Sequence, residues 1–126
     1  MTSPTKKILI VDDEEIIVDI LKRRFERMGF TVASEFNGQD CIRRLQEDRF
    51  DVVVCDIKMP EGINGLEVLQ IARSQNPEVK FVAMSGHLFP EDYINEMKMN
   101  GAAMFFKKPF YSVGKVTQQI ADLVLD

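Results

Sequence analysis

The sequence lacks tryptophan, and its 126 residues include only two cysteines and one histidine. So few thiol and imidazole groups exclude a fold held by a disulfide framework and a zinc site built from cysteine and histidine. Cys41 and Cys55 fall in an expected helix and an expected core strand, where reduced, buried thiols are the ordinary case. The sequence therefore predicts a cytoplasmic protein that folds on its hydrophobic core alone.

The sequence also has no apolar run of membrane-spanning length and no excess of positive charge. Its formal net charge is −4, whereas a nucleic-acid surface needs a basic footprint. The apolar run at 8–11 is too short for a signal-peptide core. Because no linker, repeat or low-complexity tract divides the chain, we expect one domain over 1–126 with a flexible N-terminus at 1–6. We expect no membrane span and no direct nucleic-acid binding.

Short apolar segments alternate with amphipathic ones along the whole chain. Strands are predicted at 7–11, 31–36, 52–56, 79–84 and 103–106. The first helix is predicted to end at Gly29 and to bury Ile17, Ile20, Leu21, Phe25 and Met28. Later helices are predicted around 41–45, 66–72, 90–99 and 113–124. Such alternation indicates βαβ units, so the predicted fold class is α/β with a doubly wound, five-stranded parallel sheet.

Polar side chains stand at the carboxyl ends of four predicted strands. Asp12 and Asp13 follow the first strand and Asp56 ends the third. Ser85 follows the fourth strand and Lys108 the fifth. A doubly wound sheet brings these ends to one edge, where ligands bind. Clustered carboxylates repel one another unless a cation lies among them, and oxygen ligands suit Mg²⁺. With a hydroxyl and an ammonium group, the site could stabilise a transferring phosphoryl group, and one carboxylate could be the nucleophile.

Each of these residues also has an ordinary structural explanation. Asp56 could cap a turn, and Lys108 could be a solvated charge. The acids at 12–15 could favour the first turn of a helix, where negative charge is stabilised. This is our interpretation of Glu14 and Glu15. The functional interpretation gains weight because every unusual residue falls at a strand end.

The chain resembles the receiver domains of two-component response regulators. The matching segments lie at 8–14, 51–60, 64–69, 84–86 and 108–110. They cover essentially the whole chain in the usual order, so the resemblance is specific. It implies a flavodoxin-like sheet with the strand order 2-1-3-4-5.

The resemblance assigns a role to each residue of the acidic cluster. Asp56 would be the phosphoacceptor, which attacks a phosphohistidine and becomes an aspartyl phosphate. Asp13 would bind Mg²⁺ directly, and Asp12 would bind it mainly through water. Lys58 would supply its backbone carbonyl as a further metal ligand.

The resemblance also assigns the residues of a conformational switch. Ser85 matches the switch residue whose hydroxyl moves to a phosphoryl oxygen. Lys108, rather than Lys107, matches the phosphate-contacting lysine because it directly precedes the proline. Phe105 matches the aromatic residue that changes rotamer when the switch operates.

Some positions beside the acceptor differ from the common pattern of the family. The loop between Asp56 and Gly65 is one residue longer than usual, and Gly86 replaces the usual alanine. Lys58 and His87 match the two positions that flank the path of a water attacking the phosphoryl group. Neither would readily orient that water, so we expect both to slow dephosphorylation.

The resemblance implies a signalling switch rather than a turnover enzyme. A sensor histidine kinase or a histidine phosphotransfer protein would donate the phosphoryl group. The surface over 90–99, 103–106 and 113–124 would then bind a downstream protein or a second copy of the chain. One alternative is a degenerate receiver that only binds proteins, although the acids and the lysine are all present. Another is a Mg²⁺-dependent phosphohydrolase with an aspartyl nucleophile, but the haloacid-dehalogenase type has a second aspartate where this chain has Lys58.

Overall fold

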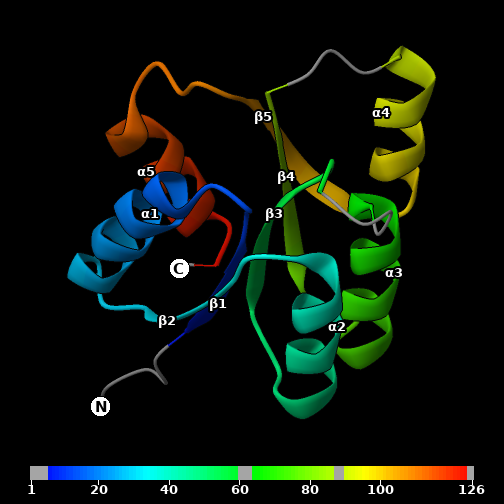
Figure 1. Ribbon diagram of the computed structural model, residues 1–126, viewed down its shortest axis with the longest axis horizontal. Coiled ribbons are helices and arrows are strands. Elements are labelled where there is room, and N and C mark those ends of the chain that lie inside the picture. The colour runs from blue at the N-terminus through cyan, green and yellow to red at the C-terminus, as the bar shows by residue number, and fades with distance from the viewer. Residues whose placement is uncertain (1–5, 60–63, 87–89, 125–126) are drawn as a thin grey trace.

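The computed structural model describes residues 6–59, 64–86 and 90–124. In this part of the chain, a five-stranded parallel sheet of order β2-β1-β3-β4-β5 is flanked by helices (Figure 1). The strands are β1 (Lys7–Val11), β2 (Thr31–Glu35), β3 (Val52–Asp56), β4 (Lys80–Ser85) and β5 (Ala102–Lys107). The helices are α1 (Glu15–Arg27), α2 (Gly38–Glu47), α3 (Gly65–Gln75), α4 (Glu91–Met99) and α5 (Val113–Asp122). The predicted fold class and strand order are confirmed. None of the described helices is long and apolar enough to cross a membrane.

Helices cover both faces of the sheet and create two hydrophobic cores. Figure 1 shows α1 and α5 on one face and α2, α3 and α4 on the other. Successive residues of a strand point to opposite faces. Leu9 and Val11 therefore join the core under α2 and α3, whereas Ile8 and Ile10 join the core under α1 and α5. Every residue of β3 is buried, as expected of a central strand covered on both sides.

The first helix buries a different set of side chains from the predicted one. Val18, Leu21 and Phe25 are buried in α1, whereas Ile20 is 40% exposed. The three buried residues are spaced three and four positions apart, so they form one stripe along the helix. Ile20 precedes Leu21 by one residue and is therefore rotated by about 100° from that stripe. The prediction that Ile20 faces inward was wrong.

The Asn37–Gly38 pair ends one element and begins the next. β2 ends at Glu35, one residue earlier than predicted, and Phe36 is left 43% exposed. The Asn37 side-chain oxygen accepts a hydrogen bond from the backbone N–H of Asp40 at 2.8 Å. Asn37 is thus the N-cap of α2, because it satisfies one of the free N–H groups of the first turn.

Both cysteines are free and buried in the core. Burial raises the pKa of the Cys41 thiol to about 12. Burial also raises the pKa of Cys55 well above its ordinary value. Since the thiolate is the reactive form of cysteine, both side chains act as small apolar core residues at neutral pH.

Candidate functional site

The polar residues predicted at the strand ends meet at the carboxyl edge of the sheet. Val11 pairs with Cys55, and Ser85 pairs with Lys107. The residues at the ends of β1, β3, β4 and β5 therefore lie nearly level with one another. The buried residues of the site are Asp12, Asp56, Ser85 and Lys108. Asp13 is exposed. Buried charges are costly unless they are paired, so contacts within the site must compensate them.

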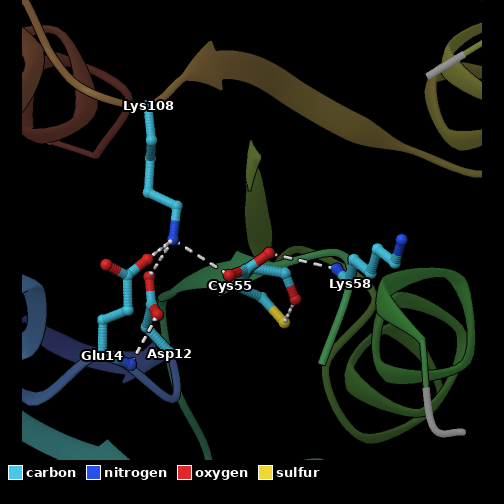
Figure 2. Close-up of polar contacts among 6 residues, drawn as sticks. Asp12, Glu14, Cys55, Lys58 and Lys108 are labelled. Carbon is cyan, nitrogen blue, oxygen red and sulfur yellow. Dashed lines mark hydrogen bonds and ion pairs between the residues drawn. The ribbon is translucent and has the colours of Figure 1, made fainter. Parts of the chain in front are cut away.

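The ammonium group of Lys108 lies at the centre of the site (Figure 2). Its Nζ donates to Asp12 Oδ2 at 2.9 Å, to Asp56 Oδ2 at 3.0 Å and to Glu14 Oε1 at 2.7 Å. An ammonium group has three N–H donors, so all of them are used. The backbone N–H of Lys108 donates to the carbonyl oxygen of Ser85 at 2.7 Å. Lys108 thus connects the carboxyl ends of β1, β3, β4 and β5.

These contacts set the protonation of the buried charges. Burial alone would lower the pKa of Lys108, but hydrogen bonds to the three carboxylates, that of Glu14 foremost, raise it above its ordinary value. Burial raises the pKa of Asp12 to about 6, although hydrogen bonds from Lys108 and from the Glu14 backbone oppose this. Lys108 therefore stays charged at neutral pH, whereas Asp12 takes up a proton in mild acid.

Asp12, Asp13 and Asp56 form a group that fits a metal ion. Each offers one carboxylate oxygen, and these oxygens lie within 4.8 Å of one another. Backbone N–H groups fix one oxygen of each buried carboxylate, from Glu14 to Asp12 Oδ1 at 2.9 Å and from Lys58 to Asp56 Oδ1 at 3.0 Å, and Lys108 binds the other oxygen of each. Three anionic oxygen ligands beside solvent suit a hard divalent cation that keeps some of its waters.

Segment 60–63 of the loop after Asp56 lies outside the described residues, and so does the extra loop residue. The loop is anchored by hydrogen bonds on both sides of this segment. The Ile57 N–H donates to the Met84 carbonyl at 3.0 Å, and the Gly65 N–H donates to the Ile57 carbonyl at 3.1 Å. A Cβ at Gly65 would lie 2.5 Å from Ile57 Cγ2, so the start of α3 approaches this loop as only glycine allows. This packing holds the loop after β3 against the start of α3.

The predicted flanking residues contribute differently. Lys58 meets Asp56 through its backbone, and Figure 2 shows its ammonium group pointing away from the carboxylates. The predicted shielding of Asp56 by Lys58 would therefore need another rotamer. His87 lies outside the described residues. A Cβ at Gly86 would lie 4.0 Å from the nearest atoms of Lys108, so the alanine usual in the family would fit there too.

The two predicted switch residues lie on neighbouring strands. Ser85 is fully buried at the end of β4. Phe105 pairs with Ala83 of β4 and packs, half-buried, against the core under α2 and α3, to which Met97 of α4 also belongs. The next residue, Phe106, packs against the opposite core. Phe105 therefore lies on the face of the sheet that carries α4, three residues before Lys108.

Glu14 is the site residue that the sequence interpretation missed. It is the N-cap of α1, and its side chain makes no capping hydrogen bond. Instead, its carboxylate contacts Lys108 from a side chain that remains 60% exposed. The interpretation of Glu14 as an acid at the start of the helix agrees with its N-cap position, but it left out the contact with Lys108. Its position directly after Asp12–Asp13, at the edge where Lys108 was expected, was the available indication.

The fold and the site together define a class of protein. A flavodoxin-like sheet carries an acidic pocket and a buried lysine at its carboxyl edge, and residues 8–121 match the response regulator receiver domain. This chain belongs to that family, whose members are phosphoacceptor switches of two-component systems with a divalent-cation site in the acidic pocket.

Individual relatives support the assignment. The chain is 34% identical to sporulation initiation phosphotransferase F of Bacillus subtilis (strain 168), over 83% of each chain. It is 30% identical to the alkaline phosphatase synthesis transcriptional regulatory protein PhoP of the same organism, over 83% of this chain and 43% of PhoP. It therefore spans less than half of that regulator. The receiver domain structure of a CheY-like protein from Methanospirillum hungatei JF-1 superposes with a TM-score of 0.84 at 26% identity, over 94% of this chain and 93% of the other.

Proposed function

We propose that this chain accepts a phosphoryl group onto Asp56 in a Mg²⁺-dependent reaction and changes the surface formed by α4, β5 and α5 as a result. The observation that carries the proposal is the buried contact between the Lys108 ammonium group and Asp56 Oδ2, within a group of three carboxylates, Asp56 included, that fits a cation. A lone capping aspartate would need neither. A buried ammonium group and a cation site are what a carboxylate nucleophile requires in order to receive an anionic phosphoryl group.

In the proposed reaction, a carboxylate oxygen of Asp56 attacks the phosphorus of a phosphohistidine. An O–P bond forms as the N–P bond breaks, and the electron pair stays on the imidazole nitrogen of the donor. The Lys58 N–H fixes one carboxylate oxygen and the Lys108 ammonium group fixes the other, so the nucleophile is oriented before the donor arrives. Lys108 also stabilises the negative charge of the transferred group.

Mg²⁺ is the proposed cation, held by Asp13 directly, by Asp12 mainly through water, and by Asp56 and the Lys58 carbonyl. When bound, it would neutralise charge on the phosphoryl oxygens. The arrangement of Asp12, Asp13 and Asp56 supports this ligand set, because one carboxylate oxygen of each lies within 4.8 Å of the others and backbone N–H groups fix the orientation of the two buried carboxylates. Oxygen ligands alone favour Mg²⁺ over softer metals.

The alternatives have less support. A degenerate receiver would have lost an acid, the acceptor or the lysine, whereas Lys108 contacts both Asp12 and Asp56. A haloacid-dehalogenase type of phosphohydrolase would need a carboxylate at position 58, and Lys58 directs its side chain away from the site. We therefore infer that the chain does not turn over external phosphate esters, but only forms and loses its own aspartyl phosphate.

A phosphohistidine-bearing protein is the proposed donor, either a sensor histidine kinase or a histidine phosphotransfer protein. Exposed apolar side chains beside the acceptor edge support a protein donor, since Ile16 is 75% exposed in the first turn of α1 and Phe36 is 43% exposed after β2. The downstream partner or second copy would bind the surface of α4, β5 and α5, where Met99 and Tyr111 are exposed. The two reduced cysteines support a cytoplasmic location.

The test of the proposed function is labelling of the wild-type protein. Acetyl phosphate with Mg²⁺ is expected to increase its intact mass by one phosphoryl group, because the proposal gives the site a single acceptor, Asp56. Hydroxylamine should remove the group, since it cleaves acyl phosphates. No increase in mass would contradict the proposal, and an increase that resists hydroxylamine would indicate a hydroxyl acceptor instead.

A second prediction concerns Phe105, the residue proposed to change rotamer after phosphorylation. Phosphorylation is expected to move Ser85 toward the phosphoryl group and to change the Phe105 rotamer, so amide NMR signals should shift in α4 and β5 as well as around Asp56. In Phe105→Ala, the shifts in α4 should largely disappear while labelling persists.

Phe106→Ala is the matched control for that experiment, because Phe106 is the next residue of β5 and packs against the opposite core. Its substitution should preserve the shifts in α4. If Phe105→Ala and Phe106→Ala behave alike, or if wild-type shifts stay confined to the loop after Asp56, the coupling through Phe105 is wrong.

A further inference from the structure

The three contacts of Lys108 differ in how easily they can be exchanged. Asp12 is 0% exposed and Asp56 is 5% exposed, so their carboxylates are far less accessible to water than an exposed carboxylate if they lose the ammonium group. The Glu14 side chain is 60% exposed, and its carboxylate can be hydrated as soon as it leaves Lys108. Glu14 is nevertheless the nearest partner, with 2.7 Å between Nζ and Oε1. Lys108 is thus held between a buried pair and one acid at the rim.

Phosphorylation of Asp56 would change the demand on Lys108. The transferred group brings three oxygens that accept strong hydrogen bonds and about 1.5 to 2 negative charges. All three N–H donors of Lys108 are already used. A bond from Lys108 to a phosphoryl oxygen therefore requires that one existing bond is given up, and the bond to hydratable Glu14 costs least to lose.

We propose that Glu14 is a positioning residue for phosphoryl transfer, which holds the Lys108 ammonium group in the unphosphorylated protein and releases it to the phosphoryl oxygens. This inference rests on the proposed function. Glu14 therefore slows phosphoryl transfer, because its carboxylate competes with the incoming phosphoryl group for the N–H donors of Lys108. Glu14 acts through Lys108 and does not itself touch the phosphorus or the acceptor.

The test compares labelling rates of Glu14→Gln and wild type with acetyl phosphate at saturating Mg²⁺. Glutamine keeps the shape of the side chain and removes the charge, so the rate is expected to rise roughly two- to fivefold, the scale of one partly exposed ion pair. Glu15→Gln is the matched control, since it removes an equal charge from the first turn of α1 and Glu15 is not among the carboxylates on Lys108. We expect its rate to stay near that of wild type.

A double substitution separates positioning from simple charge repulsion. If Glu14 acts through Lys108, Glu14→Gln should accelerate labelling only when Lys108 is present, and it should have no effect in a Lys108→Ala background. If Glu14 merely repels the anionic donor, the acceleration should be equal in both backgrounds. That result would overturn the proposal, as would equal rates for Glu14→Gln and Glu15→Gln or a slower rate for Glu14→Gln.

A spectroscopic measurement tests the release without Lys108→Ala. The side-chain NMR signals of Lys108 should differ between wild type and Glu14→Gln before phosphorylation and coincide after it, because the bond to Glu14 is then already lost. A difference that persists after phosphorylation would overturn the proposal. Failure of wild type to be labelled at all would contradict the proposed function instead, so the two failures are distinguishable.

Discussion

Replacement of Asp56 by asparagine is expected to abolish phosphoryl incorporation, with a loss of at least about a hundredfold in rate, as for removal of a catalytic nucleophile. An amide oxygen is a poor nucleophile and would not form a stable phosphoryl product. The site should otherwise stay intact, because the asparagine oxygen can accept a hydrogen bond from Lys108 or from the Lys58 N–H, as Asp56 does. Loss of labelling would therefore report the missing nucleophile rather than a collapsed site.

Intact-mass measurement after treatment with acetyl phosphate and Mg²⁺ checks this expectation. Asp51→Asn is the matched control, because Asp51 lies at the opposite end of β3, where it accepts a hydrogen bond from the Lys7 N–H at 2.8 Å. That variant should be labelled like wild type. Equal labelling of Asp56→Asn and wild type would contradict the assignment of Asp56 as the acceptor.

The second large effect is expected from Asp12→Asn. Burial raises the pKa of Asp12 to about 6 from an ordinary value of 3.8. Between about pH 4 and 6, Asp12 of the metal-free protein is therefore protonated in the folded state and ionised in the unfolded state. Stability falls as the pH rises through this window and stays low above it. Asparagine removes the buried charge, so the free energy of unfolding at pH 8 should increase by roughly 1 to 3 kcal/mol.

Denaturant unfolding in EDTA at pH 5 and pH 8 measures this effect. Wild type should lose stability between the two values, whereas Asp12→Asn should change little. Mg²⁺ should stabilise wild type but not the variant, because binding to the folded state requires the acidic group. Asp13→Asn is the control for the exposed member of that group and should lose the response to Mg²⁺ with a smaller gain in metal-free stability. The assignment fails if Asp12→Asn is no more stable than wild type at pH 8 in EDTA.

Much of this fold could be predicted because its signals are local. Short β-branched runs such as that of β3 alternate with amphipathic helices, and this pattern implies a parallel sheet with its ligand edge at the carboxyl ends. The register then brings Asp12 and Asp56 together without further information, since Val11 pairs with Cys55. The choice of Lys108 over Lys107 and the strand order came from the family resemblance.

The features that could not be predicted depend on tertiary geometry. Glu14 resembles any first-turn acid in the sequence, and its role appears only because a lysine 94 residues away reaches it. The exposure of Ile20 depends on how α1 is rotated about its axis. Apolar residues at 17, 18, 20 and 21 leave that rotation ambiguous, and packing against the sheet selects the stripe of Val18, Leu21 and Phe25.

The contact of Lys108 with Asp12 spans 96 residues, and this has a consequence during synthesis on the ribosome. The amino-terminal half of the chain emerges first, so Asp12, Asp13 and Asp56 all leave the ribosome before Lys108. Until β5 joins the edge of the sheet, these acids lack their ammonium partner and repel an anionic phosphodonor. The proposed phosphoryl-accepting site is therefore complete only when β5, the last strand, has joined the sheet.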